Sequence, residues 1–419
     1  MNFADHLKTY LDEKEIEKLL DSLKEENKHA VLLNPAKMSD ETFLSLYPDV
    51  VKHPVVPHAY IYNKGICNLG KSIYHTLGCF YLQEPSAMVP AYFLDVKEND
   101  LVLDMCAAPG GKTIQTSFNL GKSGLIIAND LSRSRCSSIV ENEERLGLGN
   151  IVVTNNDLSL IYQKLLNTFD KIILDAPCSG SGMFRKDNKM EEDWSYNKVL
   201  KFAETQKELI LIAYEMLKPG GKMVYSTCSF SYEEDEEVIK HLLDNSDAQI
   251  EDIEDNALFY KNKENHYGIH LFPHLFPGEG HYICVIKKPG NSSFKAVKEV
   301  NENNKFGIKM NKIYQFGDYL FGLNYPYNFK CFNVVRLGVK IGEVIKNEIR
   351  YDYHYSHYVE EFPQIAINAD ELELYLKGNT INSSVNKGYY LLTYNGINVD
   401  IAKADGRIIK NHFPKVYRH

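Results

Sequence analysis

The sequence predicts an α/β fold in which a mostly parallel, doubly wound sheet follows a small α+β module and precedes a β-rich region. Short apolar runs alternate with helical segments from about residue 100 to residue 227. Four prolines interrupt residues 35–57, and the Pro289-Gly290-Asn291-Ser292-Ser293 segment is typical of a linker. We therefore expect four parts: an N-terminal module (1–92), a Rossmann-like domain (93–288), a linker (289–311) and a C-terminal region (312–419).

Composition narrows the class of protein. Of the 419 residues, 44% are apolar and 25% are charged, which is ordinary for a globular protein and excludes a disordered or coiled-coil chain. There is no apolar run of about 18 residues and no secretory signal, so we expect a cytoplasmic protein without a membrane span. The eight cysteines form no C-x-x-C pair, so neither a disulfide framework nor a structural metal site is expected.

Charge gives only weak evidence about partners. The net charge is −9, which at first argues against nucleic acid. Residues 289–419, however, hold 17 lysines and arginines against 13 aspartates and glutamates. This modest excess is compatible with a phosphate-binding face, and equally with random variation.

The elements follow in order. Helix formers dominate residues 1–30, and residues 55–56 and 60–62 are typical of short strands. The central sheet is predicted from strands at 101–104, 124–130, 151–154, 171–175 and 222–227, with helices at 132–147 and 201–217. Gly220 and Gly221 are expected to close the second of these helices. In the tail, residues 334–339 and 389–394 are strand-like.

Four of these strands end at or just before an aspartate: Asp104, Asp130, Asp157 and Asp175. Ligands of such sheets bind at the carboxyl ends of the strands. A single aspartate there is often only a turn or cap residue, but four in register indicate a binding site.

The loop after the first strand reads Cys106-Ala107-Ala108-Pro109-Gly110-Gly111-Lys112 and opens a helix. Small residues let a ligand approach the backbone, and a helix N-terminus favours an anion. The loop matches neither the dinucleotide fingerprint nor the P-loop. A carboxylate at the helix end, ribose hydroxyls on Asp130 and a base edge near Asp157 would suit S-adenosylmethionine.

Two cysteines stand directly after strands. Cys178 follows the fourth strand and Cys228 follows the fifth, so both are expected to reach one cleft beside the cofactor. A thiolate there is a candidate nucleophile, whereas the alternative is a small buried apolar side chain. We expect that alternative for Cys79, Cys136, Cys284 and Cys331.

These motifs together resemble the RNA (cytosine-5) methyltransferase family. The resemblance is carried by residues 104–113, 175–180 and 227–229, and it extends to segments 82–88, 182–186, 206–208, 272–274 and 278–282. The tail segments 393–396 and 410–415 are similar to the RsmF-type branch, which methylates 16S ribosomal RNA and ends in a PUA-like domain. His270 stands where that pattern has an arginine, and Leu32-Leu33-Asn34 lacks an arginine that is often found before the asparagine.

The resemblance implies a class I methyltransferase with a mostly parallel seven-stranded sheet. It also implies that the N-terminal module (1–92) recognises RNA and that the C-terminal region (312–419) binds RNA and ends in a PUA-like domain. It implies that Cys228 adds to C6 of cytosine, that Cys178 assists proton removal and product release, and that Asp175 holds the cytosine edge. S-adenosylmethionine would be bound by Cys106, Ala107, Ala108, Pro109, Gly110, Gly111, Lys112, Asp130, Asp157 and Asp175, with Arg135 helping to seat it.

The implied partner is 16S rRNA or the 30S subunit, with no obligate protein partner and a monomeric chain. Alternatives are a tRNA (cytosine-5) methyltransferase and a non-catalytic RNA-binding assembly factor. A DNA cytosine methyltransferase would use Cys178 as the nucleophile, and the Thr227-Cys228 pair argues against it. His274 and His281 are interpreted as structural residues.

Overall fold

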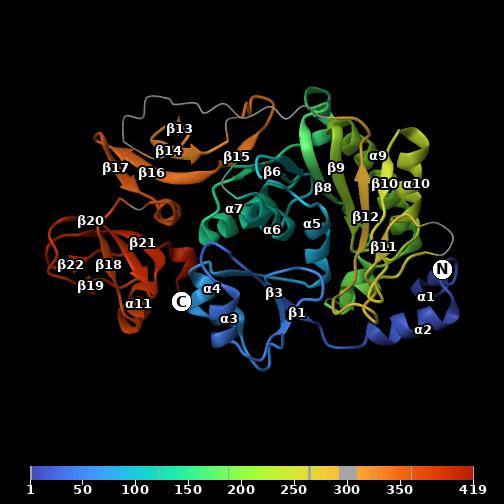
Figure 1. Cartoon of the computed structure of the whole chain (residues 1–419), viewed down its shortest axis with the longest axis horizontal. Coiled ribbons are helices and arrows are strands. Elements are labelled where there is room, and N and C mark those ends of the chain that lie inside the picture. The colour runs from blue at the N-terminus through green and yellow to red at the C-terminus, as the bar shows by residue number, and fades with distance from the viewer. Residues whose placement is uncertain are drawn as a thin grey trace.

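The structure is a computed structural model that describes residues 2–418 except 122, 187, 263–265, 292–307, 309, 326 and 360. In Figure 1 the N-terminal module lies below the central sheet, and two C-terminal sheets lie to the left. The module shares one apolar core with the C-terminal region, and this core includes Val31, Tyr375 and Leu392. No helix in the described part of the chain has the length and apolar character needed to cross a bilayer.

The N-terminal module combines helices with a four-stranded antiparallel sheet of order β2-β3-β1-β4. Its strands are β1 (His29–Leu33), β2 (Val51–Lys52), β3 (Ala59–Tyr62) and β4 (Phe80–Gln83), and its helices are α1 (Phe3–Leu7), α2 (Glu13–Ser22), α3 (Asp40–Leu46) and α4 (Ile73–Thr76). The predicted helical region 1–30 is thus two helices followed by the start of a strand. The strand expected at 55–56 is absent, and β2 at Val51–Lys52 pairs with β3 instead.

The first two helices pack away from this sheet. Phe3, Leu7 and Leu19 form one apolar cluster with Trp194 and Phe230 of the central domain. The Asp12 side chain begins α2 by accepting a hydrogen bond from the Glu15 backbone N–H at 3.0 Å. This packing places the first residues of the chain beside the loop that follows Cys228.

The central sheet has the order β10-β12-β9-β8-β5-β6-β7-β15, with β11 paired to β12. Its five middle strands are parallel and confirm the predicted ones: β5 (Leu101–Asp104), β6 (Leu125–Asn129), β7 (Ile151–Thr154), β8 (Phe169–Asp175) and β9 (Leu217–Thr227). β12 (Tyr282–Lys287) pairs antiparallel with β9, and both β10 (Gln249–Glu251) and β11 (Ile269–His270) pair antiparallel with β12. The sheet is therefore Rossmann-like and mostly parallel in its middle.

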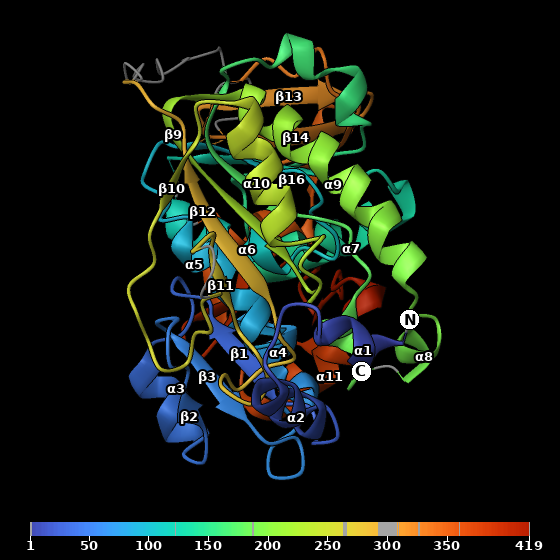
Figure 2. The same cartoon turned by 90° about the vertical axis from the view of Figure 1, so that its right-hand side faces the viewer.

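Helices cover both faces of this sheet, as the buried runs in its strands require. Apolar residues of α5 (Val89–Phe93), α6 (Gly111–Leu120) and α7 (Arg133–Leu146) fill the core on one face. Those of α9 (Tyr196–Met216) and α10 (Glu236–Asn245) fill the other, and Figure 2 shows both helices in front of β9 and β12. The short α8 (Asn188–Glu192) precedes α9. Because α9 ends at Met216, Gly220 and Gly221 lie inside β9 and do not close the helix.

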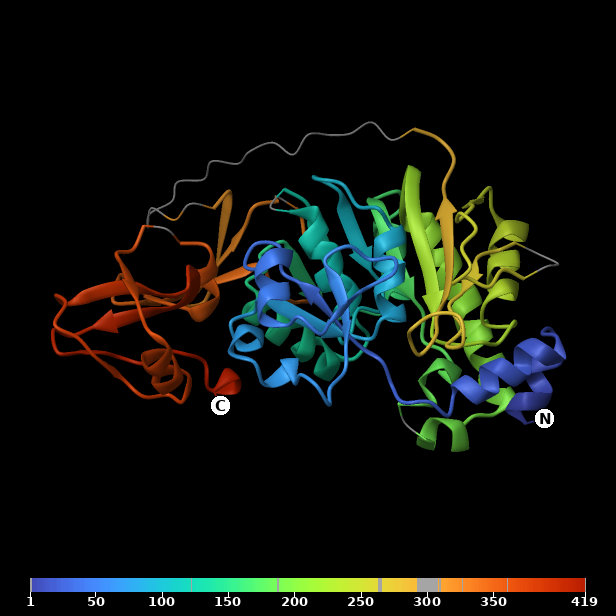
Figure 3. The same cartoon turned by 60° about the horizontal axis from the view of Figure 1, so that its bottom comes forward.

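The C-terminal region forms two sheets at the end of the molecule opposite α1 and α2 (Figure 3). The first has the order β13-β14-β16-β17 and consists of β13 (Lys312–Phe316), β14 (Tyr319–Leu323), β16 (Val339–Ile345) and β17 (Glu348–Tyr351). The second has the order β18-β20-β21-β22-β19 and consists of β18 (Gln364–Ala366), β19 (Ile381–Asn382), β20 (Gly388–Tyr394), β21 (Ile397–Ala404) and β22 (Ile408–Ile409), with α11 (Ala369–Leu376) beside it.

One strand of this region departs from the expected division. β15 (Val334–Leu337) pairs antiparallel with β7 at the edge of the central sheet, and the buried Arg336 forms an ion pair with Glu144 of α7. Among the described residues the sheet therefore has nine strands, whereas the resemblance implied seven. Most of the predicted linker at 289–311 lies outside the described residues.

Candidate active site

The loop between β5 and α6 is shaped for close approach to its backbone. Gly110 has a φ of +110°, a conformation that favours glycine, and a side chain at Gly111 would lie 2.7 Å from the Gln83 amide nitrogen. The Ala108 backbone N–H donates to Asp130 Oδ2 at 3.2 Å, which ties the loop to the end of β6. The peptide bond before Pro109 is cis.

Two adjoining cavities open at the carboxyl ends of the parallel strands, with volumes of about 450 and 550 Å³. They share six lining residues: Cys106, Ala108, Arg135, Asp175, Ala176 and Cys228. Asp104 and Lys112 line the first cavity, while Asp130, Asp157 and Cys178 line the second. The predicted convergence of the strand-end aspartates and both cysteines is thus present in one continuous hollow.

Asp104 is a buried carboxyl group with one free oxygen. Its Oδ2 accepts a hydrogen bond from Thr113 Oγ1 at 2.6 Å, whereas its Oδ1 has no hydrogen-bond partner among the described residues. Burial raises the pKa of Asp104 to about 7, and the charge of Asp175 adds to that rise. An acceptor of this kind at a cavity wall suits a cationic donor such as an ammonium group.

Asp175, at the end of β8, is in contrast surrounded by donors. Lys112 Nζ donates to its Oδ2 at 2.7 Å, and Ser226 Oγ donates to its Oδ1 at 2.7 Å. His281 Nε2 lies 3.8 Å from the same Oδ1. Although burial raises the pKa of Asp175, the charges of Lys112 and His281 outweigh that effect and hold it well below its usual range. Asp175 is therefore a fixed negative charge.

The two strand-end cysteines face one another. The sulfur atoms of Cys178 and Cys228 are 3.2 Å apart, and both side chains are partly buried. The hydrogen bond with Cys228, together with burial, raises the pKa of the Cys178 thiol well above its ordinary value. Cys178 is thus held as a neutral thiol in contact with the sulfur of Cys228.

Glu234 joins the two loops that carry these cysteines. It is fully buried and accepts hydrogen bonds from the Ser179 backbone N–H at 2.8 Å and from Ser229 Oγ at 2.6 Å. Gln206 Nε2 of α9 donates to it at 3.1 Å. Because each serine directly follows one of the cysteines, Glu234 sets the distance between the two thiols.

Sequence reasoning missed Glu234 and the role of His281. Glu234 lies in an acidic run five residues after Thr-Cys-Ser, and that run reads as a solvated helix start. His281 was interpreted as structural, yet it lines the first cavity and lies 3.4 Å from Lys112 Nζ. His274 forms an ion pair with Glu15 of α2. The sequence signal that could have identified His281 is its position directly after the Gly278–Gly280 turn.

The remaining predicted site residues differ in which of the two cavities they line. Cys106, Ala107, Ala108, Pro109 and Gly111 line the first cavity, whereas Gly110 does not and serves the turn. Arg135 lines both cavities, and its guanidinium donates to the Ala108 carbonyl at 2.6 Å. Asp157 is exposed at the wall of the second cavity, where it accepts a hydrogen bond from the Ser159 backbone N–H at 3.1 Å.

Comparison with known families and structures agrees with this geometry. Residues 91–287 match the family model of the 16S rRNA methyltransferase RsmB/F. Residues 1–85 match the N-terminal domain of 16S rRNA methyltransferase RsmF, and residues 362–419 match the methyltransferase RsmF PUA domain. All three models therefore belong to one type of protein, in the expected order.

Curated relatives extend over most of the chain. The ribosomal RNA small subunit methyltransferase F of Shewanella piezotolerans is 30% identical over 426 residues, covering 92% of this chain and 90% of the relative. That of Psychromonas ingrahamii is 32% identical over 387 residues, covering 83% and 80%.

Solved structures share the fold. A methyltransferase homolog protein from Pyrococcus horikoshii superposes with a TM-score of 0.60 at 28% identity, covering 68% of this chain and 94% of its own. NSun6 from the same organism, solved with SFG, gives a TM-score of 0.63 at 22% identity, covering 69% and 98%. With the Rossmann-like sheet, the paired thiols and the matching domains all in place, the chain belongs to the RsmB/F family of methyltransferases, in its RsmF branch.

Proposed function

We propose that this chain is an S-adenosylmethionine-dependent RNA (cytosine-5) methyltransferase that forms 5-methylcytosine in 16S rRNA through a covalent adduct on Cys228. The observation that carries this proposal is the 3.2 Å separation of Cys178 and Cys228 at the cavity wall. Two thiols in one site allow one to act as the nucleophile and the other to handle a proton.

The cavity fits the cofactor. The free Oδ1 of Asp104 would accept from the ammonium of its methionine part, and the cavity wall of Cys106 to Lys112 would pack along it. Asp130 at the end of β6 would take the ribose hydroxyls, with Asp157 near the base and Arg135 closing the wall. When bound, S-adenosylmethionine supplies an activated methyl group.

Cys228 starts the reaction by adding its thiolate to C6 of the target cytosine. The electron pair of the C5–C6 double bond then makes C5 nucleophilic toward the methyl donor. Asp175, held as an anion by Lys112, would accept a hydrogen bond from the cytosine edge and fix the base over the thiolate. The base must leave its stack to reach the cavity, so the target is unpaired in the bound state.

Cys178 acts second. Its thiol is kept protonated by the sulfur of Cys228. Once Cys228 is bonded to C6, that neighbouring negative charge disappears, so Cys178 can release its proton to solvent and become a thiolate. Cys178 can then take the C5 proton, after which the electron pair re-forms the C5–C6 bond and expels Cys228. The order of the two cysteines is set by their mutual hydrogen bond.

The roles of the cysteines are tested with two matched variants. Incubated with RNA and cofactor, Cys178→Ala should accumulate a protein–RNA adduct that survives denaturing gels, because product release fails. Cys228→Ala should form no adduct and transfer no methyl group. If Cys178→Ala forms none while Cys228→Ala accumulates one, the assignment of roles is wrong.

The substrate is tested by mapping 5-methylcytosine in RNA from cells with and without the protein. The proposal expects lost sites in 16S rRNA, in line with the 16S relatives. Lost sites in tRNA alone would favour the tRNA alternative, and methylation unchanged at every site would favour a non-catalytic assembly factor. Purified protein with naked 16S rRNA or 30S particles then separates the two forms of the substrate.

A further inference from the structure

A second group of titratable side chains lies next to the segment that carries Cys228, because Asp235 accepts a hydrogen bond from Thr227. Asp235 and Glu236 stand at the start of α10, and His270 ends β11, 34 residues after Glu236. All three are at most 2% exposed. One ligand atom from each lies within 4.8 Å of the others. The group is distinct from the two cavities of the active site.

The hydrogen bonds of this group are incomplete. His270 Nε2 lies 2.9 Å from Glu236 Oε1, and Thr227 Oγ1 donates to Asp235 Oδ1 at 2.6 Å. Within the described residues, Asp235 Oδ2, Glu236 Oε2 and His270 Nδ1 have no hydrogen-bond partner. Buried polar atoms are rarely left in this condition, because each costs about 1–3 kcal/mol.

The distance between two of these atoms is informative. His270 Nδ1 lies 4.0 Å from Asp235 Oδ2, which is too long for a hydrogen bond. Two ligands of one tetrahedral ion with bonds of roughly 2.0–2.2 Å lie about 3.4 Å apart, so an ion here would draw these two side chains together by about half an ångström. With Nε2–H donated to Glu236, Nδ1 would present its lone pair to an ion at Asp235 Oδ2, and Glu236 would hold the imidazole in the orientation that metal-bound histidines have.

The charge around the group also calls for a cation. Two carboxyl groups share this buried site, and among the described residues the imidazole of His270 is the one ion-pair partner that each of them has. Aromatic rings enclose the imidazole: its centroid lies 4.9 Å from that of Phe272 and 4.8 Å from that of Tyr282. Such low-dielectric surroundings make uncompensated negative charge costly.

We propose that Asp235, Glu236 and His270 form a binding site for one divalent transition-metal ion, with Zn²⁺ preferred. Asp235 Oδ2 and His270 Nδ1 would bind the ion, and Glu236 would orient the imidazole. The imidazole nitrogen favours Zn²⁺ over Mg²⁺, and the affinity of a mixed nitrogen and oxygen site rises from Mn²⁺ to Zn²⁺. Solvent molecules would complete the coordination. The residues include no cysteine and His270 is far from the other two along the chain, so no metal-ligand spacing in the sequence indicates this site.

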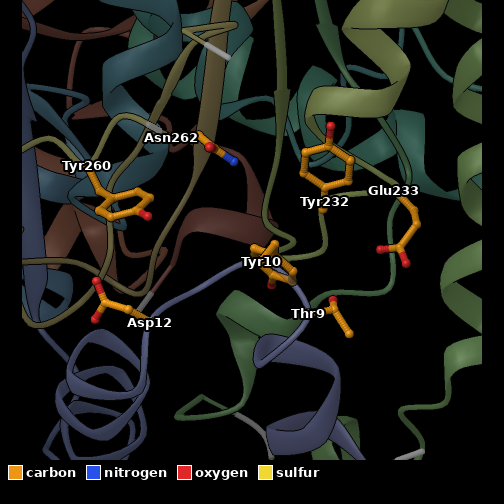
Figure 4. Close-up of a pocket in the computed structure, with 7 residues that line it drawn as sticks. All are labelled: Thr9, Tyr10, Asp12, Tyr232, Glu233, Tyr260 and Asn262. Atoms are coloured by element: carbon orange, nitrogen blue, oxygen red, sulfur yellow. The ribbon is translucent and has the colours of Figure 1, made fainter. Parts of the chain in front are cut away.

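A cavity lies beside this site, although Asp235, Glu236 and His270 are not among its lining residues. Figure 4 shows Tyr10, Tyr232, Glu233, Tyr260 and Asn262 around it, and its volume is about 490 Å³. Asn262 Nδ2 lies 3.4 Å from Glu236 Oε1, and the backbone of Tyr260 forms two hydrogen bonds with that of His270. The cavity wall thus touches the metal site, and the carboxylates of Glu233 and Asp12 at the cavity attract cations.

The ion would have a positioning role. Thr227, which bonds to Asp235, directly precedes Cys228, and its Oγ1 also accepts from the Ser229 backbone N–H at 3.0 Å. Fixing Asp235 on a metal would therefore fix the backbone on both sides of the nucleophile. No step of methyl transfer passes through the ion.

The test is zinc binding to the full chain carrying Cys178→Ser and Cys228→Ser, which removes the thiol pair as a competing zinc site. After dialysis against EDTA, we expect about one Zn²⁺ per chain by elemental analysis after gel filtration, and a rise in Tm with Zn²⁺ but not with Mg²⁺. Adding His270→Arg, which supplies a fixed positive charge in place of a ligand, should weaken zinc binding at least about 10- to 100-fold and abolish the rise in Tm.

Asp235→Asn is the second variant, in case the arginine does not fold; it keeps an oxygen for Thr227 and should also weaken binding. The proposal is overturned if the chain that carries Cys178→Ser and Cys228→Ser binds no zinc. It is equally overturned if the His270→Arg and Asp235→Asn chains bind zinc as tightly as their parent. Because every arm lacks the thiol pair and is read by metal content, the result is independent of the proposed methyl transfer.

Discussion

Carboxyl groups at and near the active site, all buried except the partly exposed Asp175, differ in how their charge is compensated. Glu234 and Asp175, which support the cysteine site, accept hydrogen bonds from several donors of other segments. Asp104 and the pair Asp235–Glu236 each leave an oxygen without a partner among the described residues. The carboxylates of the first group are therefore satisfied by donors of the protein itself, whereas those of the second each have an oxygen that can accept a cationic ligand.

The largest expected effect comes from removing Glu234. Glu234→Ala leaves the Ser179 backbone N–H and the Ser229 and Gln206 donors without their acceptor, at an expected loss of about 5 kcal/mol in unfolding free energy. Urea unfolding measures this. Methyl transfer should fall about 100-fold or more, because the loops of both thiols separate. Glu234→Gln, which keeps one acceptor oxygen, is the control and should recover part of both losses.

Asp104 gives the next effect, through pH. Its pKa is about 7 in the folded chain and 3.8 as an ordinary aspartate, so the folded state holds a proton that the unfolded state has lost between these values. This group's contribution to stability is full at low pH and is lost as the pH rises through about 7.

Asp104→Asn removes that contribution. Relative to the parent chain, the variant's unfolding free energy should therefore gain on the order of 4 kcal/mol between pH 4 and pH 7. Denaturant unfolding of both chains across this range measures the gain, and a difference that stays constant would contradict the account. The same variant should bind the cofactor more weakly, because the proposed ammonium contact is lost.

Thr227→Val gives a smaller change. The substitution keeps the shape but removes the hydroxyl that donates to Asp235 at 2.6 Å, so a further buried oxygen loses its partner. We expect a loss of about 1–3 kcal/mol in unfolding free energy. Thr227→Ser is the matched control and should restore most of it; if the two variants are equally stable, the hydrogen bond contributes little.

The smallest effect is expected on the exposed face of α10. Lys240 and Asp244 form an ion pair at 2.6 Å on the same helix that begins with Glu236, but both side chains are more than half exposed. Lys240→Ala should leave the thermal unfolding midpoint and the activity unchanged, since solvent screens such pairs. A clear loss of stability would show that an exposed carboxylate such as Asp244 contributes as much as the buried ones, and that burial does not set the size of the effect.

The sequence predicted the parallel strands and the proximity of Cys178 and Cys228 because both follow from short, continuous segments of the chain. A buried apolar run that ends in a polar residue places that residue at the carboxyl end of a strand, as it does for Asp175 and for Cys178 just beyond it. Motif resemblance then supplied the chemistry that geometry alone leaves open.

What sequence did not predict depends on contacts between distant segments. His270 reaches Glu236 only because β11 folds back along β12, and β15 joins β7 from the C-terminal region. Glu234 shows its role only when the loops after β8 and β9 lie side by side. Neither pattern has a fixed spacing that a sequence could display.

The most direct test of the account is the identity of the cysteine that bonds to RNA. 16S rRNA carrying 5-fluorocytosine cannot lose a proton from C5, so the adduct formed with the unaltered chain and cofactor should persist. Digestion and mass spectrometry should find the nucleotide on Cys228. A nucleotide on Cys178, or no adduct at all, would contradict the account.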